Sequence, residues 1–170
     1  SSYMFEYSLV AGLTASGADA YLLHVTTTPS VAYITKIDGF DCGIMISASH
    51  NPCEYNGIKI FQGTGYKLPD ALEEDIESII LDKSQVPPIK VGGEVGRITR
   101  SQTAQEDYIN YLVNLAEEDL NNNGHKNFDG IRIAVDCSNG SASGTAPKMF
   151  MSLCNECYFI ASHPNGTNIN

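Results

Sequence analysis

Short apolar runs alternate along the chain with segments in which apolar residues recur every three or four positions. Runs of the first kind are typical of buried strands, and the second pattern is typical of amphipathic helices. The expected strands are 19–25, 41–46, 57–61, 131–137 and 156–161, and the expected helices are 3–16, 29–37, 69–79, 104–120 and 147–153. This alternation predicts an α/β fold with mixed, largely parallel sheets flanked by helices.

Three features of the pattern refine this prediction. Residues 19–46 run strand, helix, strand with short joints, which predicts a parallel strand pair with a right-handed crossover. Leu72, Ile76 and Ile79 share one face of the helix after residue 69 and are expected to point inward, with the acidic residues around them on a solvated face. The segment 85–93, with its paired prolines and glycines, breaks regular structure and marks the end of the first helical layer.

The densest polar chemistry lies between two expected strands. The apolar run 42–46 is followed by Ser47-Ala48-Ser49-His50-Asn51-Pro52, and Asn56-Gly57-Ile58-Lys59 leads into the next strand. Open α/β sheets place their chemistry where strands end in small polar groups. A polar turn closed by proline would explain the short Ser-His-Asn-Pro sequence equally well.

The whole stretch resembles the phosphoserine loop of the α-D-phosphohexomutases, and among them the phosphoglucosamine mutases. The resemblance implies that Ser49 carries a phosphoryl group, that His50 and Lys59 take part in catalysis, and that Asn51 and Asn56 support the loop. A serine hydroxyl can store a phosphoryl group as an ester and return it to a different position of a sugar. Such transfer requires positive charge and positioning around the phosphoryl oxygens more than covalent assistance.

The same resemblance implies how much of the family's architecture is present. It assigns residues 1–95 to part of phosphohexomutase domain 1 and residues 96–170 to the N-terminal part of domain 2. Mg²⁺ is expected to bind partly through the phosphate on Ser49, with its other ligands beyond Asn170, because no Asp-x-Asp-x-Asp cluster occurs in these residues. We therefore expect a fragment that is inactive by itself and that self-associates through uncovered sheet edges.

The implied activity is the interconversion of glucosamine 6-phosphate and glucosamine 1-phosphate through a bisphosphate, in amino-sugar and cell-wall precursor synthesis. Residues 136–144 and 165–170 favour the glucosamine enzyme over phosphomannomutase or phosphoglucomutase, which share its phosphoryl chemistry. An alternative of another class is a non-catalytic α/β binding module, which a damaged serine loop would indicate. A serine hydrolase is disfavoured because Ser49 lacks a Gly-x-Ser-x-Gly elbow.

Composition narrows the possible partners and the location. The formal net charge of -10 argues against a nucleic-acid partner and fits an anionic sugar phosphate only if local cations offset it. No apolar run reaches the roughly 20 residues of a membrane helix, so a cytoplasmic protein without a membrane partner is expected. The five cysteines do not suggest a disulfide scaffold, and Cys154 and Cys157 are interpreted as ordinary thiols.

Overall fold

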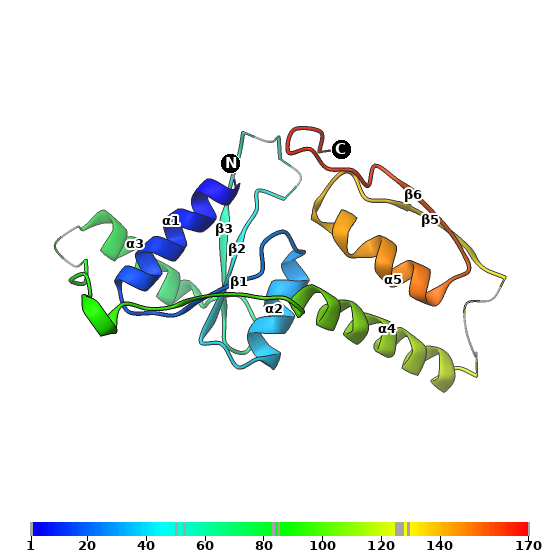
Figure 1. Ribbon diagram of the computed structural model, residues 1–170, viewed down its shortest axis with the longest axis horizontal. Helices are drawn as coiled ribbons and strands as arrows, with labels where there is room; N and C mark the ends of the chain where they lie inside the picture. The colour runs from blue at the N-terminus through cyan, green and yellow to red at the C-terminus, as the bar shows by residue number, and fades with distance from the viewer. Residues whose placement is uncertain are drawn as a thin grey trace.

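The computed structural model describes residues 2–49, 51–52, 54–82, 84, 86–124, 128 and 130–169. Figure 1 shows its helices and strands in their order along the chain. The helices are α1 (Ser2–Ala15), α2 (Thr28–Ile37), α3 (Asp70–Leu81), α4 (Ala104–Asn122) and α5 (Ala146–Leu153), with short 3₁₀ turns at Gly92–Glu94 and Ser141–Gly144. The strands are β1 (Ala20–Leu22), β2 (Cys42–Ile46), β3 (Ile58–Gln62), β4 (Ile98–Arg100), β5 (Arg132–Asp136) and β6 (Glu156–Ile160).

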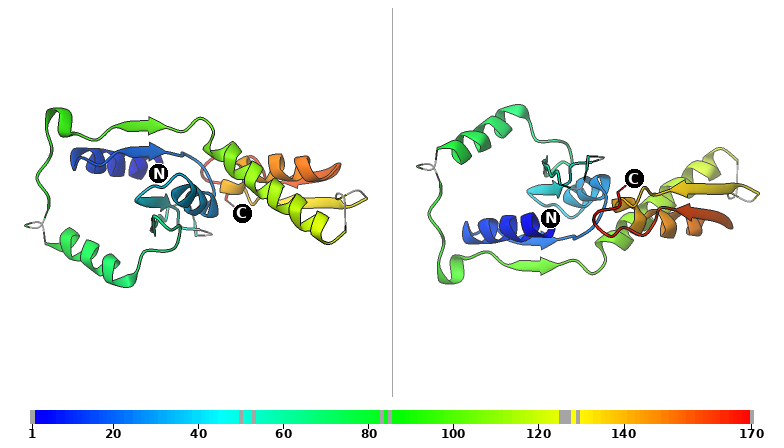
Figure 2. Two further views of the ribbon diagram at one scale, coloured as in Figure 1. Left: turned by 90° about the horizontal axis from the view of Figure 1, so that it is seen from below. Right: turned by 90° about the horizontal axis from the view of Figure 1, so that it is seen from above.

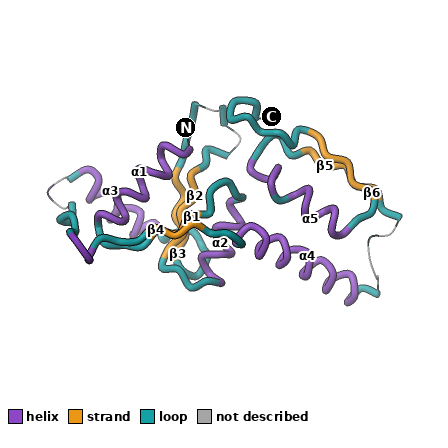
Figure 3. Tube along the Cα trace, in the orientation of Figure 1, coloured by secondary structure: helices purple, strands orange, loops and turns teal. Residues whose placement is uncertain are grey.

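The described strands associate in pairs. β1 pairs with β4 in parallel, β5 pairs with β6 in parallel, and β2 pairs with β3 antiparallel. Helices lie against these pairs, and Figure 3 shows how helical and extended segments are distributed. The predicted α/β class with mixed, largely parallel sheets flanked by helices is therefore confirmed.

The predicted parallel pairing within residues 19–46 is wrong, because β1 bonds to β4 and β2 bonds to β3. Contacts between distant parts of the chain bring β4 alongside β1. The Gly96 N–H donates to the Thr14 carbonyl at 2.9 Å, and the Arg97 N–H donates to the Asp19 carboxylate at 2.6 Å. The Ala20 N–H then donates to the Arg97 carbonyl at 2.8 Å, which starts the ladder. Strand pairing of this kind depends on partners that no local sequence pattern identifies.

β1 is also shorter than the predicted strand 19–25. It ends at Leu22, and His24 adopts a left-handed backbone with φ of 56°. A residue in that region cannot continue a strand, whose φ is strongly negative. The His24 ring instead lies 3.5 Å from the Glu6 carboxylate on α1, which makes it a tertiary contact of the helix.

Helices α2 and α4 link the β2–β3 pair to the part of the chain that contains α5 and the β5–β6 pair. α2 packs on β2, where Gly43 lies so close to Val31 and Thr35 that a Cβ at that position would overlap the Thr35 hydroxyl. On its other side α2 meets α4, and the Tyr33 and Tyr111 rings stack with their centroids 4.2 Å apart. α4 in turn packs on α5, which covers one face of the β5–β6 pair (Figure 2).

α3 differs from its predicted burial. Leu72, Ile76 and Ile79 are 48%, 37% and 37% exposed, and the helix has no buried residue. The prediction that these three side chains point inward is therefore wrong, because α3 lies apart from α1 rather than against it (Figure 2).

The expected division at residue 95 and the expected self-association both stay predictions.

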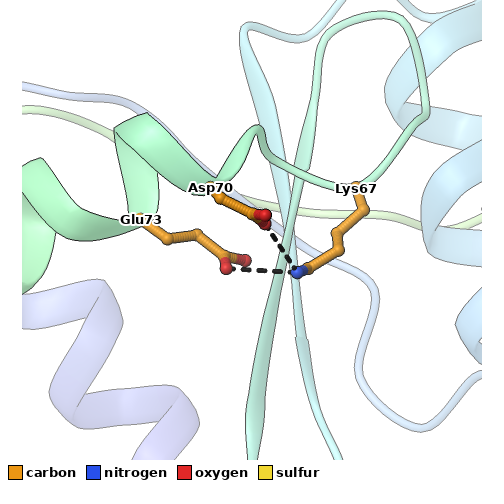
Figure 4. Close-up of polar contacts among 3 residues, drawn as sticks. All are labelled: Lys67, Asp70 and Glu73. Carbon is orange, nitrogen blue, oxygen red and sulfur yellow. Dashed lines mark hydrogen bonds and ion pairs between the residues drawn. The ribbon is translucent and has the colours of Figure 1, made fainter.

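The acidic start of α3 is a solvated face, as predicted. Lys67 lies 3.2 Å from the Glu73 carboxylate and 3.4 Å from that of Asp70 (Figure 4). The hydrogen bond to Glu73, followed by that to Asp70, raises the pKa of Lys67. One ammonium thus pairs with two carboxylates at the surface, and exposed pairs of this kind contribute little to stability.

Candidate active site

The serine loop is held at both ends by the β2–β3 hairpin. Ile46 faces Ile58 in the antiparallel register, and Met45 faces Lys59. One further bond, from the Ser47 N–H to the Gly57 carbonyl at 2.8 Å, extends the ladder into the loop. The sequence predicted both flanking strands to within one residue, and the hairpin places their intervening polar residues at one end of the pair.

Ser49 has an unusual backbone conformation. Its φ is 60°, in the left-handed region that residues with a Cβ seldom adopt, and the residue is exposed. Its N–H donates to the Ser47 hydroxyl at 3.0 Å. Such a conformation costs on the order of 1–3 kcal/mol and is concentrated at functional sites. Four other non-glycine residues also have positive φ, namely His24, Ser138, Asn139 and Ala161, but among the described residues of the serine loop Ser49 alone does.

Lys59 brings positive charge to the same loop. Its ammonium nitrogen lies 3.5 Å from the Ser47 carbonyl oxygen, at the long end of hydrogen bonding. Both Lys59 and Ser49 are thus connected to Ser47, one through its carbonyl and the other through its hydroxyl. An exposed ammonium in this position can interact with an anionic group on the neighbouring serine.

The other predicted site residues have less distinctive positions. The Asn51 N–H donates to the Ala48 carbonyl at 3.2 Å, which tightens the turn after Ser49. Asn56 is half-buried at the base of the loop. His50 lies outside the described residues, so its predicted catalytic role stays a prediction. Sequence reasoning missed Ser47, although a hydroxyl two residues before the bonded N–H is a known turn signal.

The described residues do not fit a Mg²⁺ site by themselves. Within the ranges that the structure covers, no three His, Cys, Asp or Glu side chains gather as a metal site would require. The serine loop contributes hydroxyl, amide and ammonium groups, whereas Mg²⁺ is held by carboxylates and phosphate oxygens.

The described cysteines agree with their interpretation as ordinary thiols. Cys42, Cys137, Cys154 and Cys157 are all free. Burial raises the pKa of the Cys154 thiol, which keeps it protonated and unreactive at neutral pH.

Among the helices that the structure covers, none combines the length and hydropathy that a bilayer-spanning segment needs.

Comparison with known proteins identifies the family. Residues 1–87 match the family profile "Phosphoglucomutase/phosphomannomutase, alpha/beta/alpha domain I". The chain belongs to this phosphohexomutase family. The serine loop and its flanking hairpin lie entirely within the matched residues, so the family assignment covers the candidate site.

Individual relatives agree with this assignment. The chain is 49% identical over 170 residues to a phosphoglucosamine mutase of Lachnoclostridium phytofermentans and 47% identical to one of Lachnospira eligens. It covers 36% of the length of each of these relatives, and each alignment covers 100% of the chain. A crystal structure of a phosphoglucomutase/phosphomannomutase family protein from Burkholderia thailandensis superposes with a TM-score of 0.69 at 20% identity. That superposition covers 97% of this chain and 34% of the other, and it supports the fold.

Proposed function

We propose that the protein carrying this chain is a phosphoglucosamine mutase that interconverts glucosamine 6-phosphate and glucosamine 1-phosphate. The observation that carries the proposal is the strained Ser49, presented by a hairpin loop in which the Lys59 ammonium lies 3.5 Å from the Ser47 carbonyl oxygen. The relatives in Lachnoclostridium and Lachnospira are phosphoglucosamine mutases, which supports the choice of an amino sugar. We also propose a cytoplasmic location, a hexosamine phosphate as the partner, and Mg²⁺ as the cofactor of the whole protein.

The proposed reaction uses Ser49 in both directions. In the phosphorylated enzyme, the bond between Ser49 Oγ and phosphorus breaks while the free hydroxyl of the sugar phosphate forms a bond to the same phosphorus. The sugar hydroxyl loses its proton, Ser49 regains a hydroxyl proton, and a sugar bisphosphate results. Ser49 then accepts the other phosphoryl group from the bisphosphate, which releases the isomeric monophosphate. Lys59 would offset the negative charge of the phosphoryl oxygens throughout.

Phosphomannomutase and phosphoglucomutase activity form the second candidate, because the family description itself names both. The phosphoryl steps at Ser49 are the same in all three cases, so this loop does not distinguish them. A substrate panel does: turnover of glucosamine 6-phosphate well above that of mannose 6-phosphate or glucose 6-phosphate is expected. The reverse preference would favour the second candidate and leave the role of Ser49 untouched.

The direct test is to locate the phosphoryl group. The protein carrying this chain is incubated with radiolabelled sugar bisphosphate, digested, and mapped for labelled peptides. Label is expected on Ser49. Label on Ser47 would contradict the assignment of Ser49 as the carrier, and label on no serine would favour a non-catalytic module. As a control, the 170 residues assayed alone are expected to show no mutase turnover, because their described part lacks a metal site.

Lys59 provides a second prediction. We expect Lys59→Ala to lower kcat by about 10²-fold, the usual loss for one electrostatic contact to developing charge. Lys59→Arg keeps the charge, so near-parental turnover would indicate a fixed positive charge and a large loss would indicate acid–base chemistry or strict geometry. Lys67→Ala is the matched control, since Lys67 is an exposed lysine already paired with Glu73 and Asp70. Steady-state kinetics decides, and unchanged turnover in Lys59→Ala would reject both roles.

A further inference from the structure

Three contacts meet at Ser47, a half-buried residue that directly follows β2. Its N–H donates to the Gly57 carbonyl at 2.8 Å. Its hydroxyl accepts from the Ser49 N–H at 3.0 Å, and its carbonyl oxygen lies 3.5 Å from the Lys59 ammonium. Every polar group of Ser47 is therefore used, and each contact leads to a different part of the loop.

The bond from Ser47 to Ser49 acts on the strained residue itself. A left-handed backbone at a residue with a Cβ persists only when the surroundings hold it there. Among the described residues, the Ser47 hydroxyl is the acceptor of the Ser49 N–H. A side-chain oxygen bonded to the N–H two residues later closes a small turn that competes well with extended backbone. The hydroxyl therefore favours the conformation in which Ser49 is found.

The backbone of Ser47 is itself held in place. A Cβ at Gly57 would come within 3.0 Å of the Ser47 carbonyl oxygen, so glycine at this position allows the two loop ends to approach closely. The bond to the Gly57 carbonyl ties Ser47 to the start of β3. Lys59 lies two residues after Gly57, so the same bond fixes the start of the strand that carries the Lys59 ammonium.

We propose that Ser47 is a positioning residue, whose hydroxyl holds Ser49 in its left-handed conformation and whose carbonyl places Lys59 beside it. This inference rests on the proposed phosphoryl-carrying role of Ser49. Ser47 does not itself contact the transferred group. It orients the carrier and the cation relative to each other, which is the kind of contribution on which phosphoryl transfer depends.

The test compares Ser47→Ala with Ser47→Thr in the protein carrying this chain. Loss of one hydrogen bond that aligns the carrier should lower kcat by about tenfold in Ser47→Ala, with little change in KM. Ser47→Thr keeps a hydroxyl on the same carbon and should restore kcat. A role limited to stability would not separate kcat from KM in this way. Parental kcat in Ser47→Ala, or failure of threonine to restore it, overturns the proposal.

A second measurement separates this inference from the proposed function. Solvent-exchange NMR of the Ser49 amide reports the bond to Ser47 whether or not Ser49 carries phosphate. Protection of that amide is expected to be lost in Ser47→Ala and retained in Ser47→Thr. If Ser49 takes up no label but its amide behaves as expected, the proposed function fails and the positioning role of Ser47 in the loop stands. If its amide exchanges equally fast in all three proteins, the positioning role fails.

Discussion

Replacing Ser49 with alanine should lower mutase turnover by several orders of magnitude and leave the free energy of unfolding nearly unchanged. In the proposed reaction the Ser49 hydroxyl oxygen accepts and returns the phosphoryl group, and water cannot replace a covalent carrier held in position. Ser49 is exposed, and its N–H bond to Ser47 is retained in an alanine variant. Surface substitutions of this kind usually change stability by about 0.5 kcal/mol or less. Coupled kinetic assays and urea unfolding measure the two quantities.

Ser49→Gly is the matched control for conformation. Glycine adopts positive φ without steric cost, so this variant relieves the strain and also lacks the hydroxyl. Both variants should be equally inactive, because the chemistry requires the oxygen. An alanine variant with turnover within tenfold of the parent would show that the phosphoryl carrier is another residue. A glycine variant more active than the alanine variant would show that backbone conformation, and not the hydroxyl, limits the rate.

The second large effect is expected at Gly96, where the chain turns into β4. A Cβ at this position would overlap the carbonyl group of Ala18, which is backbone and cannot rotate away. The Gly96 N–H is also bonded to the Thr14 carbonyl at 2.9 Å, which fixes the approach. We expect Gly96→Ala to destabilise the fold by about 2–3 kcal/mol, at the upper end of overpacking effects, by separating β4 from β1.

Gly93→Ala tests whether that loss is specific to the contact. Gly93 lies three residues earlier in the same segment, and a Cβ there would meet nothing within 4 Å. Its unfolding free energy should stay close to that of the parent, or rise slightly because alanine restricts the unfolded chain. Urea denaturation of both variants is the measurement. Equal stability of Gly96→Ala and Gly93→Ala would contradict the close packing of β4 on the residues before β1.

The serine loop could be predicted from the sequence because its determinants are local. The apolar run 42–46 forms β2, and the polar residues after it cannot continue a buried strand. Helix periodicity likewise located α2 and α4, which the structure places at Thr28–Ile37 and Ala104–Asn122. Ser49, Asn51, Asn56 and Lys59 therefore follow from residue order and from the family resemblance.

Other features depend on contacts that residue order does not encode. The pairing of β1 with β4 requires Arg97 to reach Asp19, 78 residues earlier in the chain. The exposure of α3 reflects the absence of a packing partner among the described elements, although its apolar periodicity is that of a buried helix. A periodic pattern shows that a face can be buried, but only the assembled fold decides what meets it.

The order of residues alone supplies the candidate site residues, because a hydroxyl, an amide and an ammonium are properties of side chains. Only the tertiary structure decided how those residues are held. The left-handed backbone of Ser49 and the convergence of Ser49 and Lys59 on Ser47 arise when the hairpin closes. Closure brings Gly57 against Ser47, although the two residues are ten positions apart in the sequence. The conformational preferences of neighbouring residues do not predict that approach. For this loop, the order of residues supplies the candidate groups, and closure of the hairpin gives them their relative positions.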